Sequence, residues 1–328
     1  MEAIASEDQT AKEKTPPRKR RLIRWLLAGG AVLILLALAY VHYWLYLPMG
    51  SGPAGRPVPH EPFQSPWTDR KVLLVGIGDS VTAGLGASAG RSYFRRLHDP
   101  RPDDFADMKG RTLQAVLPNL QTLNIAISGS NSLQHVDQVA RKLPVQPDDV
   151  FGLVVMTSGG NDLIHWYGRT PPREAAMYGA TLAEAEPWIA NYEQRMNQLL
   201  GDIVKKFPGG CLIFVCDIYD PSDGYGNPES AYLPPWPDCI AIHTRYNAAL
   251  RTAAAKLPAV RVVPMHAEFL GHGIHCRKFW SKHYRSDDPH YWYYENLEDP
   301  NDRGYDALRR LMLLEIVKER DTIAAAKN

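Results

Sequence analysis

Short runs rich in β-branched residues alternate with longer amphipathic segments from about Lys71 onward, and this alternation limits the possible folds more than any other feature. It is typical of an α/β domain with a parallel sheet, because the helices connect successive strands. We expect strands over residues 71–77, 120–127, 150–157, 211–216 and 260–263. Apolar residues at three- and four-residue steps predict helices over residues 188–203 and 303–318.

An apolar run over residues 25–47 contains no Asp, Glu, Lys or Arg. A helix of about 20 residues crosses the hydrocarbon core of a bilayer, so this run is long enough to span a membrane. Trp25 at one end, and Tyr43, Trp44 and Tyr46 at the other, stand where interfacial aromatic residues are enriched. A cleavable signal peptide is the alternative, but its apolar core is usually shorter and a small-x-small site follows it closely. We therefore expect an uncleaved anchor.

Basic residues crowd just before the apolar run, at Arg18, Lys19, Arg20, Arg21 and Arg24. The positive-inside rule then predicts a cytoplasmic N-terminus and places everything after Leu47 outside the cytoplasm. The expected organisation is a disordered cytoplasmic tail over residues 1–21, a transmembrane anchor over 22–47, a linker rich in Pro and Gly over 48–69, and a folded domain over 70–322.

The overall charge excludes one class of partner. Lys and Arg number 37 against 36 Asp and Glu, so the net charge of +1 gives no electrostatic footprint for nucleic acid. The four cysteines have no zinc-type spacing. Cys211 and Cys216 fall on one predicted strand, about 16 Å apart and beyond disulfide reach. The favoured bridge is therefore Cys239 with Cys276.

Three of the predicted strands end in clusters of small and polar residues. The first runs into Gly78-Asp79-Ser80, the second is followed by Gly129, and the third by Gly159-Gly160-Asn161-Asp162. In an open α/β sheet the carboxyl ends of the strands meet at one edge, where reactive groups gather. A nucleophilic Ser needs a tight turn and nearby N–H groups for an oxyanion, and these clusters offer both.

In this order and spacing, the three clusters resemble the motif blocks of the SGNH (GDSL-type) hydrolase family. The resemblance covers residues 71–318 and implies a flavodoxin-like three-layer α/β/α sandwich, here preceded by one transmembrane helix. It implies that Ser80 is the nucleophile, and that the backbone N–H groups of Ser80 and Gly129 and the Asn161 side chain form an oxyanion hole. No cofactor or metal is implied.

The family's fourth block is an Asp-x-x-His shortly before the last helix, and this chain departs from it. Asp287 and His290 have the spacing, and we favour His290 as the base with Asp287 orienting it, after an enlarged loop. However, Asp299 stands just before the last helix, where the family's His is expected. The alternative is therefore that this chain has lost its general base. His272, His275 and His283 are the rival bases.

These features predict ester hydrolysis through an acyl-enzyme on Ser80, acting on a small-molecule, lipid or O-acylated envelope substrate outside the membrane. An acyltransferase with the same nucleophile and a non-catalytic binding module on the same scaffold are the alternatives. The loop-rich residues 221–239 could wall a substrate cleft, and the aromatic residues 291–294 are expected to pack in the core or to anchor a loop.

Overall fold

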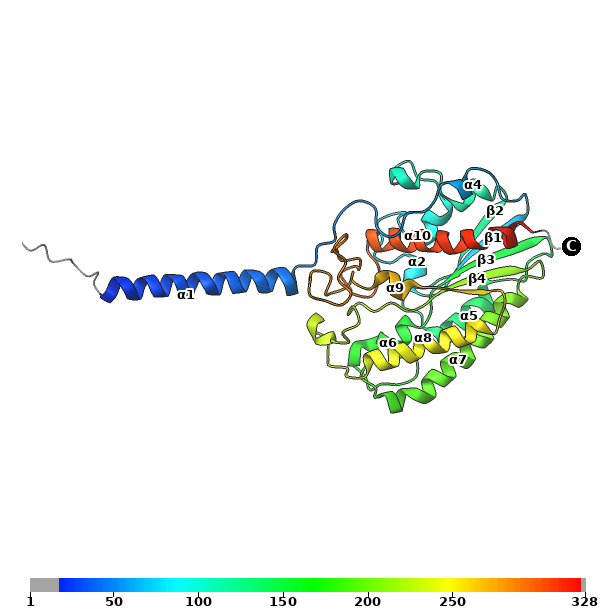
Figure 1. The fold of residues 1–328 in the computed structure, drawn as a ribbon. Coiled ribbons are helices and arrows are strands. Elements are labelled where there is room, and N and C mark those ends of the chain that lie inside the picture. Colours follow the sequence, from blue (N-terminus) through cyan, green and yellow to red (C-terminus); the bar gives the residue numbers. More distant parts are fainter. Residues whose placement is uncertain (1–17, 326–328) are drawn as a thin grey trace, which may run out of the picture. The chain divides into compact units, whose positions relative to one another are not determined.

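The computed structural model describes residues 18–325, so the predicted tail lies almost entirely outside the described residues. The chain divides into two compact units between Tyr46 and Leu47, close to the predicted end of the anchor (Figure 1).

The first unit is a helix, α1 (Arg18–Tyr40), continued by a π-helical turn over Val41–Leu45. The stretch Lys19–Leu45 is long and apolar enough to span a membrane, with a mean hydropathy of 2.3, and its most apolar window is not buried against other described residues. Signal sequences share this length and composition. The helix begins at Arg18, so the basic residues form its first turns rather than a separate tail.

The second unit is built on a sheet whose described strands are all parallel and follow the order β2-β1-β3-β4-β5. Their bounds are β1 Lys71–Ile77, β2 Leu120–Asn124, β3 Val150–Met156, β4 Cys211–Cys216 and β5 Val260–Val263. The predicted bounds of β1, β4 and β5 are confirmed. The second strand ends three residues early, because the chain turns towards Gly78 there: Ile127 N donates to the Gly78 carbonyl at 2.9 Å.

Helices cover both faces of this sheet, which confirms the three-layer sandwich (Figure 1). On β1, Val72 and Leu74 join one core cluster while Leu73 and Val75 join the other, as the two-residue repeat of a strand requires. The helices α5 (Ser132–Lys142), α7 (Leu182–Lys205) and α8 (Cys239–Ala255) lie on one face, and α10 (Asp302–Lys318) lies on the other. The shorter helices are α2 Ser80–Ala83, α3 Tyr93–His98, α4 Leu113–Val116, α6 Gly160–Ile164, α9 Met265–Phe269 and α11 Arg320–Ala324.

Local capping explains where the long helices begin. The side chains of Thr181 and Glu184 form a capping box at the start of α7, and those of Asn131 and Gln134 form another at α5. The Asn301 side chain accepts from two backbone N–H groups at the start of α10. The sequence pattern predicted α7 and α10 correctly, although α7 starts six residues earlier than the apolar stripe indicates.

The segment predicted as a linker, residues 48–69, is packed on the second unit. Ala54, Val58, Phe63 and Trp67 are buried in the core cluster beneath α10. These four apolar residues recur every four or five positions among Pro and Gly, a spacing that the composition of the segment hides. The correction has a simple physical reason: a segment that buries large apolar side chains loses the freedom of a linker.

A buried ion-pair cluster holds this segment to α10. Asp306 is fully buried and its two carboxylate oxygens accept from Arg96 (2.8 Å), Arg309 (2.7 Å) and Arg310 (2.9 Å). The same carboxylate accepts from the backbone N–H of Ala54 at 3.1 Å. Breaking one partner of a buried pair strands a charge, so this cluster fixes the docked position of the segment.

All four cysteines are free, and the predicted Cys239–Cys276 bridge is wrong. Cys276 is buried, whereas the thiol of Cys239 donates to the Gly226 carbonyl at 3.3 Å. Burial raises the pKa of Cys276 to about 12 and that of Cys239 to about 11. Both thiols are therefore in their unreactive form at neutral pH.

We expect Phe63→Ala to lower the free energy of unfolding by about 3–5 kcal/mol, since Phe63 is 5% exposed and its removal leaves a cavity. Urea denaturation of the purified protein measures the effect. His60→Ala, an exposed neighbour, is the control and should change the stability by less than about 0.5 kcal/mol. A loss below about 1 kcal/mol for Phe63→Ala would show that the segment behaves as a linker after all.

Candidate active site

The turn between β1 and α2 lies directly against the end of β3. Gly78 has φ of +127°, and a Cβ atom there would come within 2.1 Å of the Thr157 carbonyl oxygen, so only Gly fits. Asp79 follows as the N-cap of α2: its Oδ1 accepts from Thr157 Oγ1 at 2.7 Å and from Val81 N at 3.1 Å. The first and third motif clusters are thus joined through one carboxylate.

Ser80 is the first residue of α2 and is nearly buried, with its surface on a cavity. Its backbone N–H, in the first turn of a helix, has no partner within that helix. Burial raises the pKa of the neighbouring Asp79 to about 6, opposed by the Thr157 hydrogen bond and increased by the charge of Asp299. Asp79 therefore connects the two strand ends by hydrogen bonds, and its protonation depends on the charges around it.

Asn161 lies at the same cavity as Ser80, as predicted. Its Nδ2 donates to the Ser130 carbonyl at 2.8 Å, and an amide nitrogen carries two N–H groups, so one is left for a ligand. Gly159 ahead of it needs its left-handed φ of +97°, since a Cβ there would come within 2.7 Å of the Tyr192 hydroxyl. Asp162 is buried and accepts from Ser132 N at 2.8 Å, which ties the third cluster to α5.

Gly129 is on the exposed turn after β2 and lines a hollow beside that turn, next to α5. The turn is nevertheless tied to the nucleophile turn, because Ser130 Oγ donates to the Gly78 carbonyl at 3.0 Å. Beneath it, the ring of His135 contacts Ser130 Oγ (3.0 Å) and Ser158 Oγ (2.8 Å). Burial lowers the pKa of His135 to about 3, so this ring is neutral at physiological pH and bridges the two serines by hydrogen bonds.

The carboxylate beside Ser80 is that of Asp299. Burial raises the pKa of Asp299, and the nearby Ser80 hydroxyl and the Asn296 amide oppose the rise. Asn296 Nδ2 donates to Oδ2 at 2.7 Å, while Oδ1 is buried and has no hydrogen-bond partner among the described residues. One oxygen of the carboxylate that lies near Ser80 is therefore unpartnered.

His290, the predicted base, does not lie beside Ser80. Residues 291–294 run antiparallel to residues 299–301: Tyr294 N donates to the Asp299 carbonyl at 2.7 Å, and Asn301 N donates to the Trp292 carbonyl at 2.9 Å. His290 precedes Tyr294 by four residues, about 13 Å of extended chain. The structure therefore brings Asp299, not His290, to Ser80.

Asp288 rather than Asp287 pairs with His290, which corrects the predicted orienting residue. His290 Nδ1 donates to Asp288 Oδ1 at 2.5 Å, and Arg303 Nη2 donates to Asp288 Oδ2 at 2.5 Å. Asp287 is exposed. The adjacent aromatic residues Tyr291, Trp292 and Tyr293 are buried, which confirms their predicted role in packing.

The rival histidines do not line the cavity either. His272 stacks on Trp292 with ring centroids 3.4 Å apart, and His275 contacts Asn227 Oδ1 through Nε2 at 2.9 Å. Burial lowers the pKa of each to about 4.

The histidine that does line the cavity is His243 on α8, which no sequence motif indicated. Its Nε2 contacts the Ile218 carbonyl at 2.8 Å.

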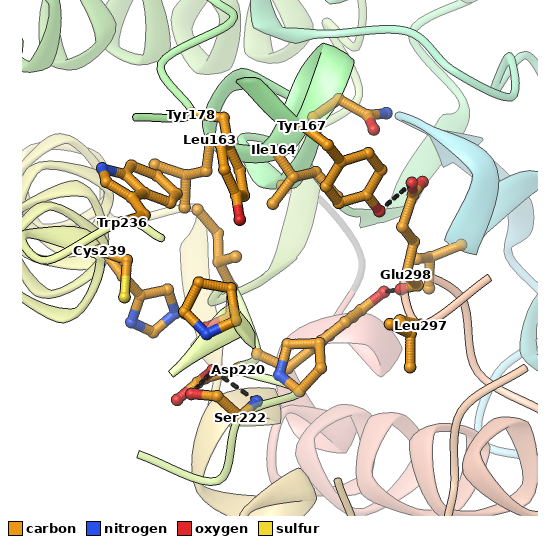
Figure 2. Close-up of a pocket in the computed structure, with 18 of the residues that line it drawn as sticks. Leu163, Ile164, Tyr167, Tyr178, Asp220, Ser222, Trp236, Cys239, Leu297 and Glu298 are labelled. Carbon is orange, nitrogen blue, oxygen red and sulfur yellow. Dashed lines mark hydrogen bonds between the residues drawn. The ribbon is translucent and has the colours of Figure 1, made fainter. Parts of the chain in front are cut away.

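The cavity of Ser80 has a volume of about 160 Å³ and is walled mostly by apolar side chains. Leu163, Ile164, Tyr178 and Trp236 form one wall, with the Tyr178 and Trp236 rings 4.9 Å apart, and Leu297 and Glu298 face them (Figure 2). Residues between 221 and 239 contribute Pro221, Ser222, Gly226, Pro228, Ala231, Leu233, Trp236 and Cys239, so the prediction that this region walls a cleft is confirmed.

Two tyrosines hold the loop that carries Asp299. The Tyr167 hydroxyl donates to the Glu298 carboxylate and the Tyr219 hydroxyl donates to the Glu298 carbonyl (Figure 2). Burial raises the pKa of Glu298, and the Tyr167 hydrogen bond opposes the rise. Both contacts join residues far apart in sequence, so no local pattern signals them. Within residues 18–325, no group of three or more His, Cys, Asp or Glu side chains is arranged to hold a metal ion.

Several solved structures are similar to this chain at low sequence identity. Among solved structures, a lipase/acylhydrolase from Enterococcus faecalis is 13% identical (TM-score 0.46; 75% of this chain and 96% of that chain). A catalytic mutant of an acetylxylan esterase from Geobacillus stearothermophilus is 19% identical (TM-score 0.46; 76% and 94%). A phospholipase A1 from Streptomyces albidoflavus is 18% identical (TM-score 0.43; 75% and 99%).

No curated protein matches the chain. Residues 77–307, more than half of the chain, match the family described as GDSL-like Lipase/Acylhydrolase. This protein therefore belongs to the GDSL-like lipase/acylhydrolase family.

Proposed function

We propose that this protein hydrolyses carboxylic esters through an acyl-enzyme on Ser80, with Asp299 as the general base in place of a histidine. The observation that carries the proposal is the buried Asp299 carboxylate near Ser80, one oxygen of which has no hydrogen-bond partner among the described residues, while Ser80 lines an apolar cavity. Membership of a hydrolase family supports the reaction class.

The proposed chemistry follows from this pair. Asp299 takes the Ser80 proton as Ser80 Oγ attacks the ester carbonyl, and the protonated Asp299 then gives that proton to the leaving alcohol. Asp299, ionised again, takes a proton from water as the water attacks the acyl-enzyme, and returns it to Ser80 as the acid departs. A raised pKa makes the carboxylate a stronger base than an ordinary Asp, which suits the task.

The oxyanion would be held by the Ser80 backbone N–H and the remaining N–H of Asn161 Nδ2, with the Gly129 N–H as a predicted third donor. Donors fixed before the reaction stabilise the developing charge without reorganisation. The network of His135, Ser130 and Ser158 supports this by holding the turns of Gly129 and Asn161 in position.

The cavity favours the acyl part of the substrate. Its volume of about 160 Å³ is comparable to that of an apolar cavity that holds one benzene ring, about 150 Å³. A short acyl chain or a single-ring acyl group fits, and the wall of Tyr178 and Trp236 provides apolar contact for it. A lipid or an O-acylated carbohydrate can carry such an ester.

We further propose that α1 anchors the protein in a membrane, with the N-terminus cytoplasmic and the hydrolase domain outside. Support comes from the apolar stretch Lys19–Leu45 and from the basic residues crowded at its N-terminal end. Product analysis with an added alcohol distinguishes hydrolysis from acyl transfer, since both use the same acyl-enzyme.

One observation favours a second candidate, a binding domain for acyl compounds without turnover. Asp299 stands where the family's histidine is expected, and an Asp that stays protonated cannot activate Ser80. A wild-type protein that binds esters in the cavity, but neither hydrolyses them nor reacts with a serine-directed phosphonate, would establish this candidate.

We expect Asp299→Asn to lower kcat/KM for p-nitrophenyl acetate by about 10²–10⁴-fold, the usual contribution of a general base. Labelling of Ser80 by a fluorophosphonate should slow in parallel, because the amide cannot accept the hydroxyl proton. His290→Ala is the matched control and should retain activity, since its ring contacts Asp288 and not Ser80.

If activity instead depends on His290 or on the cavity-lining His243, an imidazole is the base and the role of Asp299 is wrong. Urea denaturation of each variant distinguishes a lost base from a lost fold. Ser80→Ala sets the background rate for all three comparisons.

We expect Asn161→Ala to lower kcat by about 100-fold or more while changing KM little, because the oxyanion forms only in the transition state. Steady-state kinetics with the same ester measure the two constants separately. Leu163→Ala, a change in the cavity wall with no polar group, should alter mainly KM. An unchanged kcat for Asn161→Ala would exclude the proposed oxyanion contact.

The pH dependence follows from the ionisation that a base requires. Burial raises the pKa of Asp299, so kcat/KM should be low below that pKa and should reach a plateau above it. The charge of Asp299 also contributes to raising the pKa of Asp79 to about 6. The acidic limb, the rise of kcat/KM with pH, therefore reports the coupled ionisation of Asp79 and Asp299 together. A pH–rate profile should show this limb above the value of about 3.9 for an ordinary Asp. A limb that disappears in His243→Ala would identify an imidazole instead.

A further inference from the structure

The loop over residues 277–285, here the basic loop, presents aromatic and basic side chains together. Phe279 is 63% exposed and Trp280 is 49% exposed, and their rings contact each other edge to face. Of its basic residues, Lys282 and Arg285 are exposed and Arg277 is partly exposed, whereas Lys278 is buried. No Asp or Glu occurs between Leu270 and Ser286. This concentration of positive charge contrasts with the net charge of +1 for the whole chain.

The basic loop has a defined shape. Successive turns fold it, with Lys278 N donating to the His275 carbonyl at 2.9 Å and Ser281 N donating to the Lys278 carbonyl at 2.7 Å. Its end is held because the Arg285 guanidinium donates to the Leu270 carbonyl at 3.2 Å. The exposed aromatic pair is therefore presented by an ordered backbone rather than by a free chain.

The loop's neighbours contact the residues that follow the candidate span. Trp292 N donates to the His272 carbonyl at 2.9 Å, and Tyr291 N donates to the Pro48 carbonyl at 2.8 Å. Pro48 follows Leu45, the last residue of the apolar stretch, by only three positions. Three residues reach about 10 Å at most, so in an anchored protein a short stretch of chain and one hydrogen bond tether Tyr291 to the end of the span.

We infer that the basic loop docks on the anionic lipid headgroups of the bilayer in which α1 is anchored. Exposed Trp and Phe side chains partition into the headgroup region, and Lys and Arg beside them are attracted to anionic lipids. Each basic residue near such a surface contributes roughly a fivefold increase in binding. The inference rests on the proposed anchoring for the loop's closeness to the membrane, and on the loop's own composition for its partner.

The test uses the full chain in liposomes of phosphatidylcholine alone or with phosphatidylglycerol. The chain has eight Trp residues, so the fluorescence difference between wild type and Trp280→Phe isolates Trp280. We expect quenching of this component by aqueous acrylamide to fall by about half or more on the anionic liposomes, because an interfacial Trp is shielded from water.

A matched pair of charge reversals tests the cause. Arg277→Glu with Lys282→Glu should abolish the difference between the two lipids. Lys205→Glu with Lys256→Glu changes the net charge equally, at exposed positions on α7 and just after α8, and should preserve it. Equal quenching of Trp280 on both lipids, or a difference that survives the first reversal, would overturn the inference.

Carbonate extraction of the same liposomes reports separately on the anchor. Release of the protein by carbonate would refute the anchor, whereas the Trp280 measurement would still decide whether the basic loop binds anionic lipid. Ester hydrolysis by the domain does not enter either measurement.

Discussion

The close approach of Gly78 to the end of β3 determines the geometry of the whole site. With no side chain, this residue lets the turn after β1 lie on the Thr157 carbonyl, and Asp79 then joins the two strand ends through its carboxylate. Ser80 therefore enters the cavity from a turn that has little freedom. The turn after β2 hydrogen-bonds to the same Gly78 carbonyl through Ser130, so three strand ends are positioned by one short segment.

The electrostatics of the site follow from placing two carboxylates near one hydroxyl. Asp79 and Asp299 are both buried, and each pKa is raised by that burial. The repulsion between them is tolerated because the first carboxylate is fixed by Thr157 and Val81, and the second by Asn296 and by a loop that Tyr167 and Tyr219 hold. An Asp whose pKa is raised on folding lowers the stability of the fold above that pKa, so burying these two carboxylates costs stability at neutral pH.

The sequence predicted the sheet and most of the nucleophile side of the site, because those features are local. Buried strands such as Lys71–Ile77 are continuous apolar runs, and Gly-rich turns follow them directly. The arrangement of residues 287–301 around Ser80 was predicted less well. The Asp-x-x-His spacing at Asp287 and His290 says nothing about which part of the loop reaches Ser80, and the backbone pairing of Tyr294 with Asp299 decides that. The composition of residues 48–69 likewise concealed a packed segment, since four apolar side chains are diluted among Pro and Gly.

The hydrogen bond from Ala54 to Asp306 joins residues that are 252 positions apart. Half of the core, the part beneath α10, is therefore completed only when the last long helix has been synthesised and has packed against the first segment of the domain. Contacts of such long sequence separation form slowly, because the loop between them must close first. During synthesis one face of the sheet is only partly covered until α10 arrives, and exposed apolar surface of this kind favours aggregation.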